Sequence, residues 1–102
     1  MKTEQHFLQV QVKKPPVVEI DMDAWAAYVR FKNTKVAKTV DRSGSTIHMA
    51  IDLDAKGEVV GVESIGFNEL QLTMMMKQAR LKVPAAMLAK ARIVPSAQPI
   101  PA

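Results

Sequence analysis

The chain has 102 residues and a mass of 11.3 kDa, and its composition, 48% hydrophobic and 24% charged, is that of one small folded domain rather than of a disordered or membrane protein. The absence of cysteine excludes disulfides, thiolate metal sites and cysteine nucleophiles, and the N-terminal residues lack the apolar stretch of a signal peptide, so a soluble cytoplasmic protein is expected. The net charge of +4 arises in the C-terminal third, since residues 1–66 hold nine basic and nine acidic residues whereas residues 67–102 hold five basic residues and one acidic residue.

The N-terminal part of the chain predicts three strands. Residues 6–12 alternate apolar and polar side chains, as a half-buried strand requires, and the Lys-Lys-Pro-Pro run at 13–16 ends that strand. Residues 17–22 and 25–31 are rich in β-branched and aromatic side chains, which favours two further strands. A helix is also compatible with residues 23–27, because the pattern there is too short to decide.

The middle of the chain predicts a hairpin. Residues 35–40 alternate as a strand up to a turn at 42–45, and residues 46–53 then show a clear period of two. Residues 54–57, which end in Gly57, form a short connection to a partner strand at 58–65.

Beyond Gly66 the pattern changes to that of a helix. Asn68 is a good N-cap for a helix over residues 69–82, and Pro84 either ends it or begins a second short helix over residues 85–92. The prolines after Ile93 predict an extended or disordered tail.

The predicted architecture is therefore α+β. An antiparallel β-meander of four or five strands packs against one C-terminal α-helix in a domain over residues 1–83. A short second helix and a Pro-rich tail follow over residues 84–102.

Two segments carry a family resemblance. The stretch IDLDAKGEVVGVE at 51–63 and, less closely, residues 21–31 resemble the small bacterial family catalogued as domain of unknown function 2283. Within residues 21–31, Trp25 stands where that family has Asp, and Ala27 stands where it has Leu. The resemblance implies a β-meander with a C-terminal helix and no established activity, and it implies a small partner-binding protein similar to antitoxins or inhibitors.

An acidic set gives one hypothesis of enzymatic function. Converging carboxylates from Asp21, Asp52, Asp54 and Glu63 would suit a hard cation, and a metal-dependent enzyme using Asp52, Asp54 and Glu63 is one alternative. Residues 52–57 begin like a calcium loop but lack its later ligands, and Asp and Gly are ordinary in a hairpin turn. No metal or other cofactor is therefore expected.

Nucleophilic catalysis is also a minor hypothesis. His48 and Asp52 share a strand face, but positions four apart on a strand lie ~13 Å apart, too far for a hydrogen bond. Neither Ser43 nor Ser45 stands in a strand-turn-helix elbow. A surface or cross-strand role is the simpler interpretation of His48.

The predicted helix is apolar on more than one stripe, and a small sheet covers only one of them. A second stripe rich in Met suits an adaptable interface, so we expect a homodimer and a protein partner. The expected partner-binding residues are Leu72, Met75, Met76, Ala79 and Val83. The competing interpretation is that the helix is apolar because it is buried in the core of its own chain.

The excess of positive charge supports a second alternative, a nucleic-acid-binding protein that contacts phosphates. Its residues are Lys77, Arg80, Lys82, Lys90 and Arg92. A solvated helix face explains the same pattern, and no aromatic platform is interleaved with it. The sequence thus favours a non-catalytic interaction module that self-associates and binds a protein partner.

Overall fold

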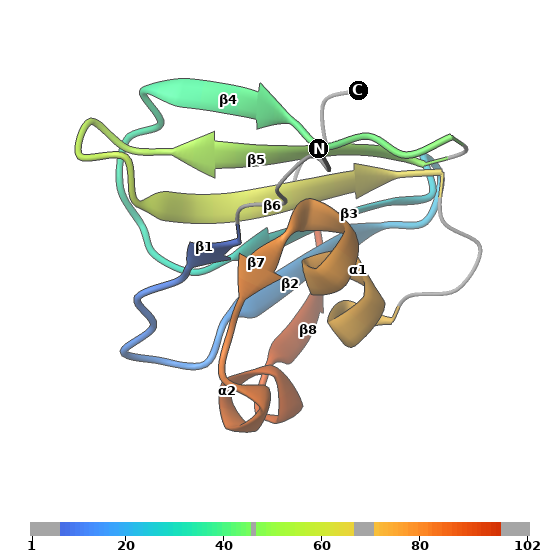
Figure 1. Cartoon of the computed structure of the whole chain (residues 1–102). Coiled ribbons are helices and arrows are strands. Elements are labelled where there is room, and N and C mark those ends of the chain that lie inside the picture. The colour runs from blue at the N-terminus through green and yellow to red at the C-terminus, as the bar shows by residue number, and fades with distance from the viewer. Residues whose placement is uncertain (1–6, 46, 67–70, 97–102) are drawn as a thin grey trace.

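The computed structural model describes residues 7–45, 47–66 and 71–96 (Figure 1). Six strands form the main sheet: β2 Val17–Asp21, β3 Ala26–Arg30, β4 Lys38–Asp41, β5 His48–Leu53, β6 Val59–Ile65 and β8 Arg92–Pro95. The remaining elements are two short strands, β1 Leu8–Gln9 and β7 Leu81–Lys82, and two helices, α1 Leu72–Ala79 and α2 Ala85–Ala89. Within these described ranges, no helix has the length and apolar character needed to cross a membrane.

The main sheet is mixed and largely antiparallel, with the strand order β4-β5-β6-β3-β2-β8. Strands β2 and β3 pair as neighbours in sequence, as do β4, β5 and β6, but β3 pairs with β6 instead of β4. Strand β8 then joins the edge of β2 in parallel. The α+β class is confirmed, whereas the simple meander of four or five strands is corrected to six strands with two crossovers.

The β5–β6 hairpin was predicted and is confirmed. Ile51 lies opposite Val62 in its register, which shifts between Asp52 and Leu53. In the turn, the Asp54 Oδ1 accepts hydrogen bonds from the backbone N–H groups of Lys56 at 2.9 Å and Glu58 at 3.0 Å. Gly57 has a φ of 82°, a left-handed conformation that glycine adopts without strain.

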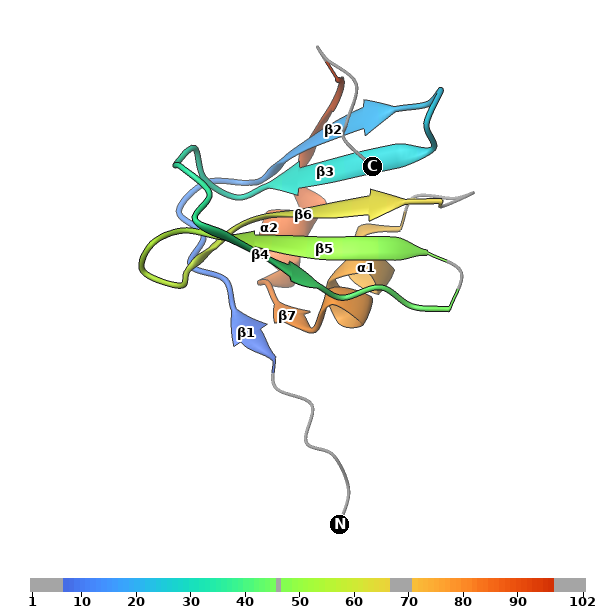
Figure 2. The same cartoon turned by 90° about the horizontal axis from the view of Figure 1, so that it is seen from above.

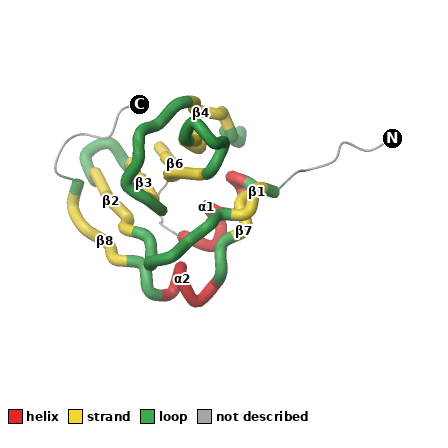
Figure 3. Tube along the Cα trace, turned by 90° about the vertical axis from the view of Figure 1, so that its left-hand side faces the viewer, coloured by secondary structure: helices red, strands yellow, loops and turns green. Residues whose placement is uncertain are grey.

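One face of the sheet forms the core. Its buried side chains include Val18, Val29, Met49, Ile51 and Val62. The covering layer supplies Val10 from the N-terminal arm, three residues of α1, and Leu81 of β7. Figure 3 shows the strands along a curve from β4 to β8, with α1, α2, β1 and β7 on one side of it. Figure 2 shows the same layers from above.

The helical region differs from the prediction at both ends. Helix α1 spans Leu72–Ala79 instead of residues 69–82, and the predicted cap at Asn68 lies outside the described residues. The helix ends because Arg80 adopts a left-handed conformation, with a φ of 58°. The chain then forms β7, which pairs with the N-terminal arm. The Leu8 N–H donates to the carbonyl of Arg80, just before β7, and the Val10 N–H donates to the carbonyl of Lys82, both at 3.0 Å. The N-terminal strand predicted over residues 6–12 is correspondingly reduced to the two residues of β1.

The C-terminal region is also more ordered than expected. Helix α2 begins directly after Pro84, as predicted, but ends at Ala89 instead of residue 92. Residues 92–95 form β8 in the main sheet, so the expected unpacked tail is wrong for this segment. An edge position accommodates Pro95, because in an edge strand every second backbone N–H points away from the sheet.

Candidate functional site

A groove lies between the short β1–β7 sheet and the two helices, with a volume of about 600 Å³. Met76, Leu81, Val83 and Leu88 give it an apolar lining. Phe7, which is 38% exposed, adds an aromatic side chain. The other side chains include Lys77 and Lys82, both exposed, and the described residues that line the groove include no carboxylate. The groove is therefore an apolar depression with positive charge beside it.

The predicted partner-binding residues divide between the core and this groove. Met75, Met76 and Ala79 are buried against the sheet of the same chain, and Leu72 and Val83 are half-buried beside them. Met76 and Val83 also line the groove. The apolar side chain that α1 leaves most exposed is Met74, at 57%. The expected stripe is thus largely covered by the chain itself.

The predicted basic residues lie in different elements of the fold. Lys77 lies in α1, Arg80 caps its C-terminus, Lys82 lies in β7, Lys90 follows α2 and Arg92 begins β8. The structure brings Lys77 and Lys82 together at the groove. Arg80 faces another cation: burial and the nearby Arg80 charge lower the pKa of Arg42 from its usual value.

The acidic residues proposed as metal ligands have separate partners. Asp52 accepts hydrogen bonds from two hydroxyl groups, Asp54 pairs with Lys32 at 2.6 Å, and Glu63 contacts His48 at 3.4 Å. Asp21 accepts two backbone N–H groups in the β2–β3 turn. Among the described residues, no three His, Asp or Glu side chains come close enough to share a metal ion. The structure does not bring the acidic set together.

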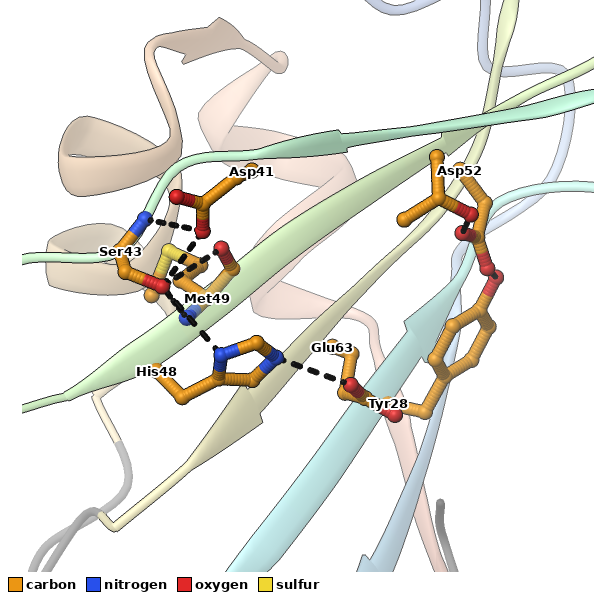
Figure 4. Close-up of polar contacts among 8 residues, drawn as sticks. Tyr28, Asp41, Ser43, His48, Met49, Asp52 and Glu63 are labelled. Carbon is orange, nitrogen blue, oxygen red and sulfur yellow. Dashed lines mark hydrogen bonds and ion pairs between the residues drawn. The ribbon is translucent and has the colours of Figure 1, made fainter. Parts of the chain in front are cut away.

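The face of the sheet opposite the core carries a polar network that was not predicted (Figure 4). The Tyr28 hydroxyl donates to Asp52 Oδ2 at 2.8 Å, and the Thr39 hydroxyl donates to Asp52 Oδ1 at 2.7 Å. Burial and the Asp52 carboxylate raise the pKa of Tyr28 above its usual value. The Arg30 guanidinium lies 4.9 Å from the centre of the Tyr28 ring, a cation–π distance. The available signal was the alternation of the strands, which places these side chains on the face away from the core.

A second chain of contacts on this face involves His48. Its Nδ1 lies 3.3 Å from the Ser43 hydroxyl and its Nε2 lies 3.4 Å from Glu63 Oε1, so its partners are Ser43 and a cross-strand carboxylate instead of Asp52 (Figure 4). Burial raises the pKa of Glu63, and His48 opposes that shift. Ser43, His48 and Glu63 thus have the residue types of a nucleophile, a base and an orienting acid.

The hydrogen bonds of Ser43 favour a structural role. Its hydroxyl donates to Asp41 at 2.6 Å, which is much closer than His48, and it accepts the Met49 N–H at 3.0 Å. The hydrogen bonds that Asp41 accepts from the Ser43 hydroxyl and from the Ser43 backbone N–H lower the pKa of Asp41. An activated serine gives its proton to the base, whereas the Ser43 hydroxyl donates to the Asp41 carboxylate. Ser43 therefore stabilises the connection between β4 and β5 through its hydrogen bonds to Asp41 and Met49.

Comparisons of the chain with protein-family models, curated proteins and solved structures find no match.

Proposed function

We propose that this protein is a non-catalytic interaction module that binds an acidic, partly apolar segment of a protein partner in the groove between β1, β7, α1 and α2. The observation that carries the proposal is the combination of an apolar lining with Lys77 and Lys82 and with no carboxylate among the described lining residues. Apolar side chains of the partner bury surface in the groove, and its carboxylates meet the two ammonium groups.

The two lysines are available to a partner. Both side chains are exposed, and neither forms an ion pair with any residue that the structure describes. A charged group with no ion pair to the described part of its chain gives up none of those contacts when it binds another molecule. Complementary charge also selects against basic segments and speeds association.

A protein partner is favoured over nucleic acid by the distribution of charge. Of the five predicted basic residues, the described lining of the groove includes Lys77 and Lys82, and most of its other side chains are apolar, which suits a protein segment better than a phosphate backbone.

The proposal is tested by selecting from a random 12-residue peptide library displayed on phage, with the full chain as the target. We expect enriched peptides that combine Asp or Glu with large apolar residues. The enriched peptide is then titrated by calorimetry against the Lys77→Glu/Lys82→Glu variant, which should bind about tenfold or more weakly, a loss of at least ~1.4 kcal/mol.

The matched control is Lys13→Glu/Lys14→Glu, which makes the same charge change outside the groove and should bind within about twofold of the natural chain. Selection of basic or purely polar peptides, or equal losses in both variants, would show that the groove is not the binding site.

A further inference from the structure

We infer a second site in this chain: a pocket for a small organic anion with an apolar body, where the linker between β1 and β2 meets the end of β3. The pocket has a volume of about 460 Å³. Small-molecule sites usually have ~300–1,000 Å³ and are mostly apolar with a few polar groups. This site is separate from the proposed peptide groove, since the two share no lining residue.

Apolar side chains line part of the pocket. Pro15 and Val17 come from the linker and the first residue of β2, and Phe31 follows β3. Val17 is the register partner of Arg30 in the β2–β3 pair, so this pairing places the residues next to each other. Phe31 is only 7% exposed, and its backbone N–H donates to Val60 O at 2.8 Å. An apolar ligand body therefore meets a surface that the sheet holds in place.

Two of the four cations around the pocket already have partners. Arg30 forms an ion pair with Glu19 at 3.2 Å, and Lys32 lies 2.6 Å from both Asp54 and Glu58. The two carboxylates raise the pKa of Lys32. These ion pairs join two cations to three carboxylates, a net charge of −1, and the Glu58 carboxylate also lines the pocket.

Lys13 and Lys14 are the other two cations, and they provide the charge for a ligand. Neither forms an ion pair with a residue in the described part of the chain. Their side chains are exposed beside the apolar lining. Two ammonium groups that border one pocket suit a carboxylate, sulfonate or phosphate headgroup.

The backbone that carries the two lysines is restrained. Pro15 and Pro16 fix their own φ angles and limit the residue before them. Pro16 is fully buried, and its carbonyl accepts the Arg92 N–H at 3.0 Å, which ties the linker to β8. Less conformational freedom is lost when a ligand binds to a restrained segment.

The probe for this site is 8-anilinonaphthalene-1-sulfonate, which joins a sulfonate to aromatic rings. Its fluorescence is titrated with the folded full chain and with three companions: Lys13→Gln/Lys14→Gln, the control Lys77→Gln/Lys82→Gln at the groove, and the uncharged probe N-phenyl-1-naphthylamine. Affinity at the pocket is measured from the amide chemical shifts of Val17 and Phe31, because the apolar groove beside Lys77 and Lys82 has features that suit the same probe. By this site-specific measurement we expect the pocket variant and the uncharged probe each to lose about tenfold or more in affinity, and the groove variant to stay within about twofold. Amide chemical shifts of Val17 and Phe31 should move on titration.

Circular dichroism checks that each variant is folded, and we expect that it is because all four lysines are exposed. The inference is wrong if the sulfonate probe does not bind, if the pocket variant binds it as well as the natural chain does, or if the uncharged probe binds equally well. Loss of binding in the groove variant alone would assign the probe to the groove and would also refute the inference. None of these outcomes changes the peptide selection that tests the proposed function.

Discussion

Gly61 lies against the Tyr28 ring on the open face of the sheet, and a Cβ added there would overlap the ring. We expect Gly61→Ala to lower the free energy of unfolding by about 1–3 kcal/mol, because the ring must leave its position beside Asp52. In a Tyr28→Ala background the same change should cost nothing, and urea unfolding of the four chains measures the difference. An equal cost with and without the tyrosine ring would show that the close contact is not the cause.

Asp54 is expected to contribute to the stability of the chain against acid. Its pKa lies below the usual range, chiefly because of the bond to Lys32 and then because of the Glu58 N–H. A carboxyl group whose pKa is lower in the folded chain stabilises the fold above its ordinary pKa of ~3.9, and this contribution is lost as the pH falls through the folded value.

The unfolding midpoint in urea, followed between about pH 6 and pH 2, should therefore fall less steeply for Asp54→Asn than for the natural chain. Asn keeps an oxygen that can accept the turn N–H groups, so the substitution removes mainly the charge. Lys32→Met should also make the unfolding midpoint fall less steeply as the pH decreases, because it removes the main cause of the lowered Asp54 pKa. Parallel curves for all three chains would contradict this role of the ion pair.

At the scale of the elements, local pattern predicted the strands and not their partners. The β5–β6 hairpin was predictable because its alternation and its Gly57 turn are contained in one segment. Strands β7 and β8 were missed, because each is extended only where a distant segment pairs with it, β1 for the first and β2 for the second. The pairing of β3 with β6 likewise could not be predicted from the local alternation of side chains, because that alternation does not specify which strands pair.

The role of β8 is tested by substituting proline at each of two neighbouring positions in this strand. Arg92 N–H donates to Pro16 O and Ser96 N–H to Ile20 O, so alternation directs the N–H of Val94 toward β2 and that of Ile93 away from it. We expect Val94→Pro to lower the free energy of unfolding by about 1–3 kcal/mol, since a carbonyl of β2 loses its donor. Ile93→Pro should cost clearly less, and thermal unfolding compares the two. Equal costs would show that β8 is not bonded to β2 in this register.

At the scale of the whole molecule, the candidate site combines residues that the sequence marked for different reasons. Met76 and Val83 were expected in a protein interface, and Lys77 and Lys82 in a nucleic-acid interface, yet all four line one groove. Periodicity indicated that the helix has more than one apolar stripe. It did not show that Met75, Met76 and Ala79 are covered by the sheet of the same chain, because that depends on how strongly the sheet curves around α1.

The expected homodimer stays a prediction, and the burial of α1 changes the surface that would form it. Met74, 57% exposed, is the apolar side chain that this helix presents to solvent, so we expect a dimer that uses it. Light scattering should then give a dimer mass for the natural chain and a monomer mass for Met74→Glu. The control Met22→Glu, at a side chain 56% exposed in the β2–β3 turn, should remain dimeric.

A natural chain that stays monomeric at high concentration would refute self-association. It would leave the peptide groove intact, because β1, β7, α1 and α2 complete that site within one chain. A dimer that both substitutions leave unchanged would instead place the interface away from α1. The mass measurement and the peptide selection therefore separate two forms of interaction that the sequence alone joined in a single helix.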